Sequence, residues 1–191
     1  MAKMIKTIIR GLFKLIYGRV NFDNNINYST SVSEIDKYKN ETKSDQKYFL
    51  YISDNCRIYT DLNENVAVIK DGIILNGHSY QQVNGKLESI QQNSVLKNGT
   101  PYLKKKINGN IFNLLQGSSG ENYFHFMFDV LPKLWLIESK IKFEDIDYFL
   151  LNKKIDWQIK ILKKIGISSN KILTAKQYRH IEATRIISVT H

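Results

Sequence analysis

Residues 146–173 carry the stretch that decides the fold: Ile-Asp-Tyr-Phe-Leu-Leu-Asn-Lys-Lys-Ile-Asp-Trp-Gln-Ile-Lys-Ile-Leu-Lys-Lys-Ile-Gly-Ile-Ser-Ser-Asn-Lys-Ile-Leu. The short apolar run 146–151 predicts a strand, residues 156–164 predict a helix, and 171–173 predict a second short strand. Strand, helix and strand in this order predict a parallel β-α-β unit with a right-handed crossover.

The same alternation continues on both sides of this unit. An apolar helical stretch is expected at 121–138 and a further strand at 184–189. Residues 116–191 are therefore predicted to form an α/β segment with a doubly wound parallel sheet. Such sheets bind ligands at the carboxyl ends of their strands. Because the sequence stops directly after the last predicted strand, we expect this segment to be truncated at its C-terminus.

Two segments of different composition precede the α/β segment. Residues 48–115 contain short β-rich runs, and Asp71-Gly72 between two of them is a hairpin signal because both residues tolerate a positive φ. This segment is predicted to be an antiparallel meander. Residues 21–47 are polar and non-periodic, and they are interpreted as a linker. The β-rich runs are 48–52, 57–60, 65–69, 72–75 and 110–115.

Residues 1–20 have the pattern of a basic amphipathic helix. Apolar side chains recur from Ile5 to Ile16 with a helical period, and Lys6, Arg10 and Lys14 fall on another face. The bases interrupt the segment too often for a bilayer-spanning helix, and the uninterrupted apolar centre of a signal peptide is missing. Two interpretations stay open: the helix lies in the interface of an anionic membrane, or it packs on the domain with its bases solvated.

The net charge of +10 over 191 residues is concentrated at the two ends. Residues 1–20 hold five bases and no acid, and residues 151–191 hold nine bases against two acids. No reader motif or aromatic-interleaved basic stripe is present, so nucleic acid is not an expected partner. The single cysteine and four scattered histidines give no disulfide framework or metal-ligand spacing. No metal or cofactor is therefore expected, and a cytoplasmic location is predicted.

Residues 117–134 carry the densest chemical signal. Ser118 and Glu121 have capping-box spacing, which places a helix start near them. Within that helix, polar side chains share one face, and apolar side chains cover the rest, so the helix is predicted to be buried. Its aromatic residues, among them Tyr123, Phe124 and Trp135, are accordingly expected to pack in the core rather than against a ligand. Pro132 is expected to kink or restart the helix. The polar face consists of Asn122, His125, Asp129 and Lys133.

Physical reasoning leaves two interpretations of this polar face. The first is a core helix in which Asp129 orients His125 as an internal hydrogen-bonded pair. In the second, the turn from Gly117 to Gly120 binds an anion at the helix N-terminus. His125 then deprotonates or polarises a hydroxyl while Asp129 fixes its tautomer.

The motif Asn-x-x-His-x-x-x-Asp-x-x-Pro, here Asn122, His125, Asp129 and Pro132, resembles the bacterial branch of the family 61 glycosyltransferases, the capsular polysaccharide biosynthesis type. The strand at 111–115 and the helix and turn that follow Trp157 are also similar to that family. The resemblance covers about residues 60 to 191. It implies an inverting, nucleotide-sugar-dependent and metal-independent enzyme with two Rossmann-like halves facing a cleft, a GT-B-like architecture. Family members are about twice as long, so this chain resembles the N-terminal lobe.

This resemblance implies roles for individual residues. His125 is then the catalytic base or an acceptor-binding group, and Asp129 orients it. Anion or substrate contacts come from the turn, from Asn122 and Lys133, or from the basic final segment. The turn residues are Gly117, Ser118, Ser119 and Gly120.

The expected partners are a nucleotide sugar and a glycan or lipid-linked acceptor, at the cytoplasmic face of the membrane that residues 1–20 contact. Two other functions stay open. One is a non-catalytic lobe that binds glycan, nucleotide or a partner subunit, and the other is a basic membrane-surface adaptor whose α/β segment binds no ligand.

Overall fold

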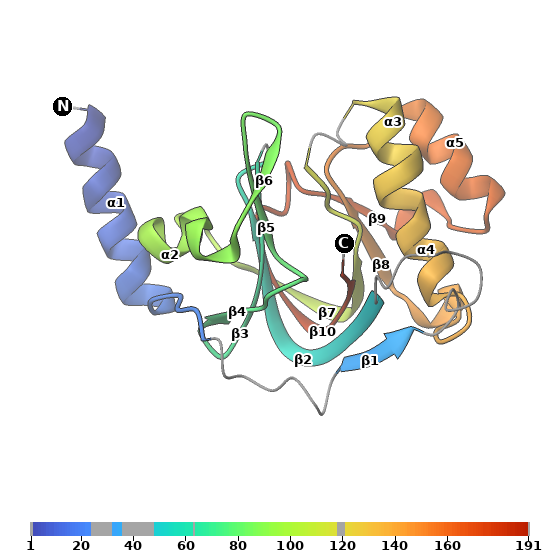
Figure 1. Cartoon of the computed structure of the whole chain (residues 1–191), viewed down its shortest axis with the longest axis horizontal. Helices are drawn as coiled ribbons and strands as arrows, with labels where there is room; N and C mark the ends of the chain where they lie inside the picture. The colour runs from blue at the N-terminus through green and yellow to red at the C-terminus, as the bar shows by residue number, and fades with distance from the viewer. Residues whose placement is uncertain (1, 24–31, 36–47, 63, 118–120, 191) are drawn as a thin grey trace.

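The computed structural model describes residues 2–23, 32–35, 48–62, 64–117 and 121–190 (Figure 1). The helices are α1 Ala2–Tyr17, α2 Ser94–Asn98, α3 Tyr123–His125, α4 Leu131–Ile137 and α5 Asp156–Lys164. The strands are β1 Val32–Ile35, β2 Tyr48–Thr60, β3 Asn65–Lys70, β4 Ile73–Ile74, β5 Tyr80–Val83, β6 Lys86–Glu88, β7 Lys105–Asn113, β8 Tyr148–Leu151, β9 Ile172–Thr174 and β10 His180–Val189.

The strands form a mixed sheet with the order β6-β5-β3-β2-β10-β7-β8-β9, while β1 pairs with β2 and β4 with β3. β10, β7, β8 and β9 are parallel to their neighbours in this series, whereas β2 is antiparallel to β10. The fold is therefore mixed α/β with a partly parallel sheet and an N-terminal helix. The predicted unit β8-α5-β9 is confirmed, and α5 begins and ends at the predicted residues.

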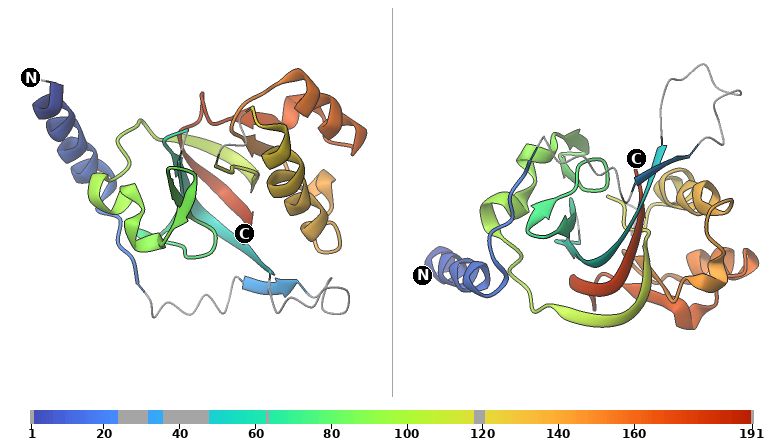
Figure 2. Two further views of the ribbon diagram at one scale, coloured as in Figure 1. Left: turned by 45° about the horizontal axis from the view of Figure 1, so that its top comes forward. Right: turned by 90° about the horizontal axis from the view of Figure 1, so that it is seen from below.

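The four parallel strands have the order 3-2-1-4 when they are numbered along the chain, so the strand order reverses between β7 and β10. The prediction of a doubly wound sheet needs a correction, because α4 and α5 contribute to the same core (Figure 2). The opposite face of the parallel strands packs on the antiparallel strands, which leaves that face no room for a helix.

Strand alternation sends neighbouring side chains into these two cores. Phe112, Phe149 and Ile187 belong to the core beneath α4 and α5. Their neighbours Ile111, Leu150 and Ile186 belong to the second core, on the inside of the curled sheet. All six are nearly or fully buried. The parallel strands are therefore apolar on both faces, as expected for strands at the centre of a mixed fold.

The antiparallel meander is confirmed, although its boundaries differ from the prediction. The runs at 48–52 and 57–60 are one continuous strand, β2. The last predicted run of the meander belongs to β7, which pairs in parallel with β8 and β10. Strands of the β-rich and α/β segments thus share one sheet. β1 lies within the predicted linker 21–47, so part of that segment is sheet; residues 24–31 and 36–47 lie outside the described residues.

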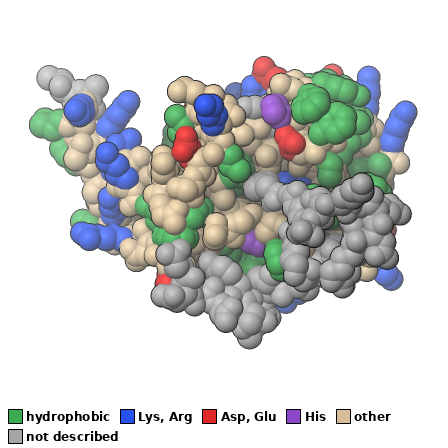
Figure 3. Space-filling view, in the orientation of Figure 1, with side chains coloured by type: hydrophobic (Ala, Val, Ile, Leu, Met, Phe, Trp, Pro, Cys, Tyr) green, Lys and Arg blue, Asp and Glu red, His purple; other side chains and the backbone are tan. Residues whose placement is uncertain are grey.

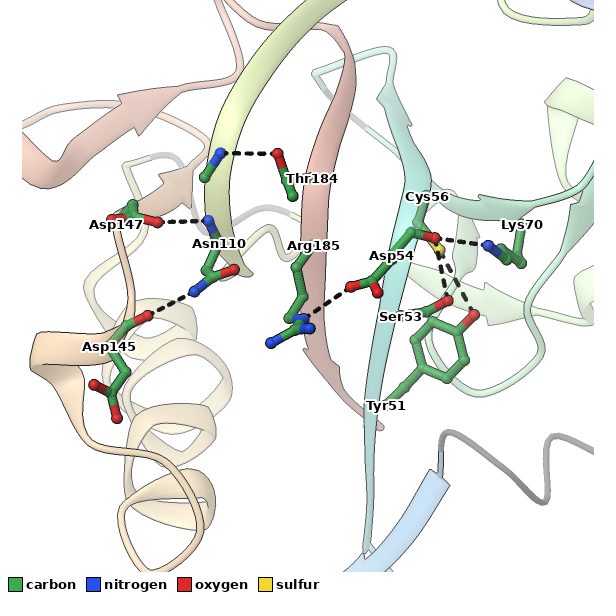
Figure 4. A network of polar contacts seen from close by, with 11 residues as sticks. Tyr51, Ser53, Asp54, Cys56, Lys70, Asn110, Asp145, Asp147, Thr184 and Arg185 are labelled. Carbon is green, nitrogen blue, oxygen red and sulfur yellow. Dashed lines mark hydrogen bonds and ion pairs between the residues drawn. The ribbon is translucent and has the colours of Figure 1, made fainter.

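Polar contacts join β7, β8 and β10 on the side where β8 begins (Figure 4). Asp147 accepts a hydrogen bond from the backbone N–H of Asn110 at 2.7 Å. Thr184 stands at an irregularity in the β10–β7 register, and its hydroxyl accepts from the N–H of Gly109. The next residue, Arg185, pairs with Asp54 of β2 at 2.8 Å. These contacts join the start of β8 to the middle of β7, the middle of β7 to β10, and β10 to β2.

The Asp71-Gly72 hairpin gives a direct test of the predicted turn. Both residues have positive φ, 50° and 79°, and they connect Lys70 to its partner Ile73. Gly72→Ala should lower the free energy of unfolding by about 1–2 kcal/mol, because an L side chain is strained at this φ. Urea denaturation measures the change.

Gly11→Ala is the matched control, because a Cβ there meets no other atom within 4 Å and the residue lies in helix α1. Alanine is the better helix former, so this variant should be neutral or slightly more stable. Equal destabilisation of both variants would contradict the turn assignment.

Candidate functional site

The helix that carries the sequence motif begins one turn later than the capping box suggested. Asn122 is its N-cap, and the Asn122 side chain accepts a hydrogen bond from the backbone N–H of His125 at 3.3 Å. Glu121 instead forms an ion pair with Lys153, which follows β8. Asn122 therefore orders the first helical turn, and Glu121 attaches that turn to the neighbouring strand end.

The motif helix changes its hydrogen-bond pattern along its length. α3 passes into a π-helical segment, Phe126–Val130, before α4 begins at Leu131. Pro132 falls in the first turn of α4, where the hydrogen-bond pattern changes from π to α. The predicted kink or restart at Pro132 takes the form of this change of pattern, because the helical residues run without a break from Tyr123 to Ile137. Single-turn π segments occur frequently at functional sites.

His125 and Asp129 form the pair that both interpretations of the polar face require. The distance between His125 Nδ1 and Asp129 Oδ2 is 2.7 Å, and each side chain is about a third exposed. With Nδ1 engaged by the carboxylate, Nε2 is the ring nitrogen left to meet a ligand. The pair is therefore not an internal core pair, and it is accessible from solvent.

Lys133 lies further along the same face and is buried. Its Nζ donates a hydrogen bond to the backbone carbonyl of Leu115, directly after β7, at 2.9 Å. Burial lowers the pKa of the Lys133 amine to about 7, and the nearby carboxylate of Asp129 opposes this shift. An amine with such a pKa is partly deprotonated at neutral pH, whereas an ordinary surface lysine stays fully charged.

A cavity of about 220 Å³ opens beside Asp129 and Lys133. Gln116 follows β7 and Thr190 follows β10, so the cavity lies at the carboxyl ends of the two strands where the strand order reverses. Ligands of open α/β sheets bind at such a position. Its remaining lining residues are Tyr48, Phe128, Pro132 and Leu136.

A second, basic cavity of about 520 Å³ lies at the carboxyl ends of β8 and β9. The two cavities are neighbours, because the backbone N–H of Gln116 in the first donates to Asn152 Oδ1 in the second at 3.0 Å. Each base in the lining comes from the basic final segment of the sequence. The lining consists of Leu62, Asn152, Lys153, Lys154, Ile155, Thr174, Lys176 and Arg179.

The prediction that the motif helix is buried over most of its surface is wrong. Tyr123, Phe124 and Trp135 are each more than half exposed, and so is Phe128. The rings of Phe124 and Phe128 lie 4.6 Å apart, and Phe124 also meets His125 edge to face. Two exposed aromatic side chains, Phe124 and Phe128, thus lie beside the His125–Asp129 pair on the surface.

The predicted anion-binding turn is only partly described. Ser118, Ser119 and Gly120 lie outside the described residues. Gly117 stands against β5, since a Cβ at this position would lie 2.1 Å from Gln82 Oε1. A larger side chain at Gly117 would have to displace Gln82.

Sequence reasoning missed one residue near the first cavity, His78. Burial, together with the positive charge of Lys133, lowers the pKa of the His78 imidazole to about 4. Its Nδ1 has no hydrogen-bond partner among the described residues, and its ring packs on Tyr51 at 5.3 Å. No spacing in the sequence marks His78, because only the tertiary fold brings it close enough to feel the charge of Lys133.

No group of three His, Cys, Asp or Glu side chains within the described ranges is arranged to hold a metal ion. Comparisons with known protein families, with curated proteins and with solved structures found no match for this chain.

The pKa of Lys133 predicts a pH-dependent stability. The folded state binds fewer protons than the unfolded chain between the folded pKa, about 7, and the ordinary lysine value of 10.5. Stability should therefore rise with pH through this window, by about 1 kcal/mol per pH unit. Lys133→Met removes the titrating group, so its stability relative to the wild type should fall steadily from pH 7 to pH 9.

Urea denaturation of both proteins at several pH values measures this difference, and the comparison cancels groups that titrate in both chains. A constant difference across the window would show that Lys133 keeps an ordinary pKa in the folded protein.

Proposed function

We propose that this chain is the Rossmann-like lobe of a GT-B-like, inverting glycosyltransferase of the family 61 type. The observation that carries the proposal is the position of the His125–Asp129 pair, beside a cavity at the carboxyl ends of β7 and β10. The strand order 3-2-1-4 matches the first four strands of a Rossmann-type sheet, 3-2-1-4-5-6, and includes its point of reversal. The motif that resembles the family thus stands beside the ligand position expected for such a sheet.

In the proposed reaction, a hydroxyl of a glycan or lipid-linked acceptor donates its proton to His125 Nε2. The acceptor oxygen then forms a bond to the anomeric carbon of a nucleotide sugar, and the bond from that carbon to the diphosphate breaks. The nucleoside diphosphate leaves with the bonding electron pair. Asp129 holds Nδ1 and stabilises the imidazolium that forms.

The basic cavity provides positive charge for the leaving diphosphate. Lys154 and Lys176 line this cavity with Lys153 and Arg179, and the Gln116–Asn152 hydrogen bond places it next to the first cavity. Positive groups that face developing negative charge lower the barrier of such a transfer. The proposal therefore assigns the diphosphate to the basic cavity and the acceptor to the surface around His125.

The exposed rings near His125 fit the acceptor side of this proposal. Phe124 and Phe128 present a contiguous aromatic surface, with their rings tilted by 33° to each other, next to the imidazole. Sugar rings pack their apolar faces on exposed aromatic side chains of this kind, which orients the hydroxyl groups at the ring edge.

His125→Asn tests the chemical step. The protein is assayed for release of nucleoside diphosphate from nucleotide sugars, with and without lipid-linked glycan acceptors. The variant should lose activity by a factor of about 100 or more, because general-base catalysis contributes at least that much. Asp129→Asn should also lower the rate, since the amide no longer fixes the tautomer of His125.

Gln91→Ala, at an exposed position of the 3-10 turn Ile90–Gln92, is the control and should keep full activity. Near-normal turnover by His125→Asn would remove His125 from catalysis. Nucleotide binding without turnover by the wild-type protein would instead support the non-catalytic lobe.

The basic cavity is tested separately by calorimetric titration with nucleoside diphosphates such as UDP and GDP. The double variant Lys154→Ser and Lys176→Ser should weaken binding at least about tenfold, because it removes two charge-assisted contacts to phosphate. The same Lys→Ser change at Lys86 and Lys97, which are both exposed, removes the same two positive charges. This control variant should bind nucleoside diphosphate as the wild type does. If the two double variants bind nucleoside diphosphate with the same affinity, the diphosphate does not bind in the basic cavity.

A further inference from the structure

Helix α1 exposes a continuous apolar face. Among its described side chains, seven large apolar ones are between 42% and 85% exposed: Met4, Ile5, Ile8, Ile9, Leu12, Leu15 and Ile16. With 3.6 residues per turn these positions share one broad stripe of the helix. Contiguous apolar surface of this kind on an otherwise ordinary protein surface marks an interaction site.

The opposite side of α1 holds the helix to the body of the protein. Lys14 Nζ donates to the backbone carbonyl of Lys97, and the Tyr17 hydroxyl accepts from the backbone N–H of Lys104. The Tyr17 ring also meets His180, the first residue of β10, edge to face at 4.9 Å. These contacts occupy the last turn of α1, and the rest of the helix projects away from the sheet (Figure 1).

The apolar stripe is therefore turned away from the body rather than toward it. In the space-filling view, hydrophobic side chains of α1 gather on the outer side of the helix and Lys and Arg side chains on the side toward the body (Figure 3). A helix that needed only internal packing would turn its apolar stripe inward. α1 does the reverse, so its stripe faces whatever surrounds the protein.

The charges of this segment indicate which partner covers the stripe. Residues 1–20 carry Lys3, Lys6, Arg10, Lys14 and Arg19 and no acidic residue. A second copy of α1 would add five more positive charges and no acidic residue to pair with them, which disfavours pairing of two α1 helices. An anionic lipid surface offers negative charge at the level of the bases and an apolar layer for the stripe.

We propose that α1 lies in the interface of an anionic bilayer and holds the protein to the membrane surface. Its apolar stripe enters the boundary between headgroups and acyl chains, while Lys6 and Arg10, on the other face, reach the headgroups. No helix among the described residues has the length and apolar character needed to cross a bilayer. This docking does not depend on the enzymatic proposal, since it rests on residues of α1 alone.

Co-sedimentation of the whole chain with vesicles tests the proposal. Vesicles of phosphatidylcholine mixed with phosphatidylglycerol should bind the protein at least about tenfold more strongly than phosphatidylcholine alone. Each base near an anionic surface contributes about 1 kcal/mol, which is roughly fivefold in the partition constant. Binding to the anionic vesicles should weaken as the salt concentration rises.

The double variant Ile8→Asp and Leu15→Asp places charge on the stripe and should weaken vesicle binding at least about tenfold. The matched control is Leu87→Asp and Leu103→Asp, which changes two exposed leucines outside α1, 64% and 76% exposed, and should bind as the wild type does. Circular dichroism verifies that both double variants remain folded.

Three results would overturn the proposal. The first is absence of binding to anionic vesicles, and the second is equal binding by the two double variants. The third is self-association without lipid, measured by light scattering, that Ile8→Asp and Leu15→Asp abolish and the control keeps. That result would show that a second copy of the chain covers the stripe.

Discussion

The pairing of β10 on both its edges holds this fold together. One edge pairs antiparallel with β2, where Val189 lies opposite Leu50, and the other pairs parallel with β7. These partners come from distant parts of the chain, so their pairing has to offset a large loop-closure entropy. Burial supplies the compensation, since Ile186 and Ile187 are buried on opposite faces of the strand.

The candidate site depends on this strand. Thr190 follows β10, Gln116 follows β7, and both line the cavity beside Asp129 and Lys133. The motif helix alone brings His125 to Asp129, a pair separated by four residues. It does not bury Lys133, whose lowered pKa results from packing against the strand ends. An accessible imidazole and a buried amine thus arise on one helix face because only part of that face is covered.

β10 also contacts both helix α1 and the cavity of the candidate site. The Tyr17 ring of α1 packs on His180, where β10 begins, and Thr190 at the far end of β10 lines the site cavity. If α1 docks on a membrane, the strand that builds the site is held at a fixed distance from the lipid surface. Such an arrangement suits an acceptor that is itself attached to lipid.

The sequence alone determined the features that depend on local chain geometry. The helix Asp156–Lys164, the Asp71-Gly72 turn and the His125–Asp129 pair each follow from spacing within a few residues. The tertiary structure decided which apolar surfaces are covered and which strands pair across the chain. Tyr123, Phe124 and Trp135 were predicted to be buried and are exposed, and no sequence signal marks His78, whose pKa is lowered by burial and by the charge of Lys133. Periodicity shows which side of an element is apolar, but whether another element covers that side depends on contacts between distant residues.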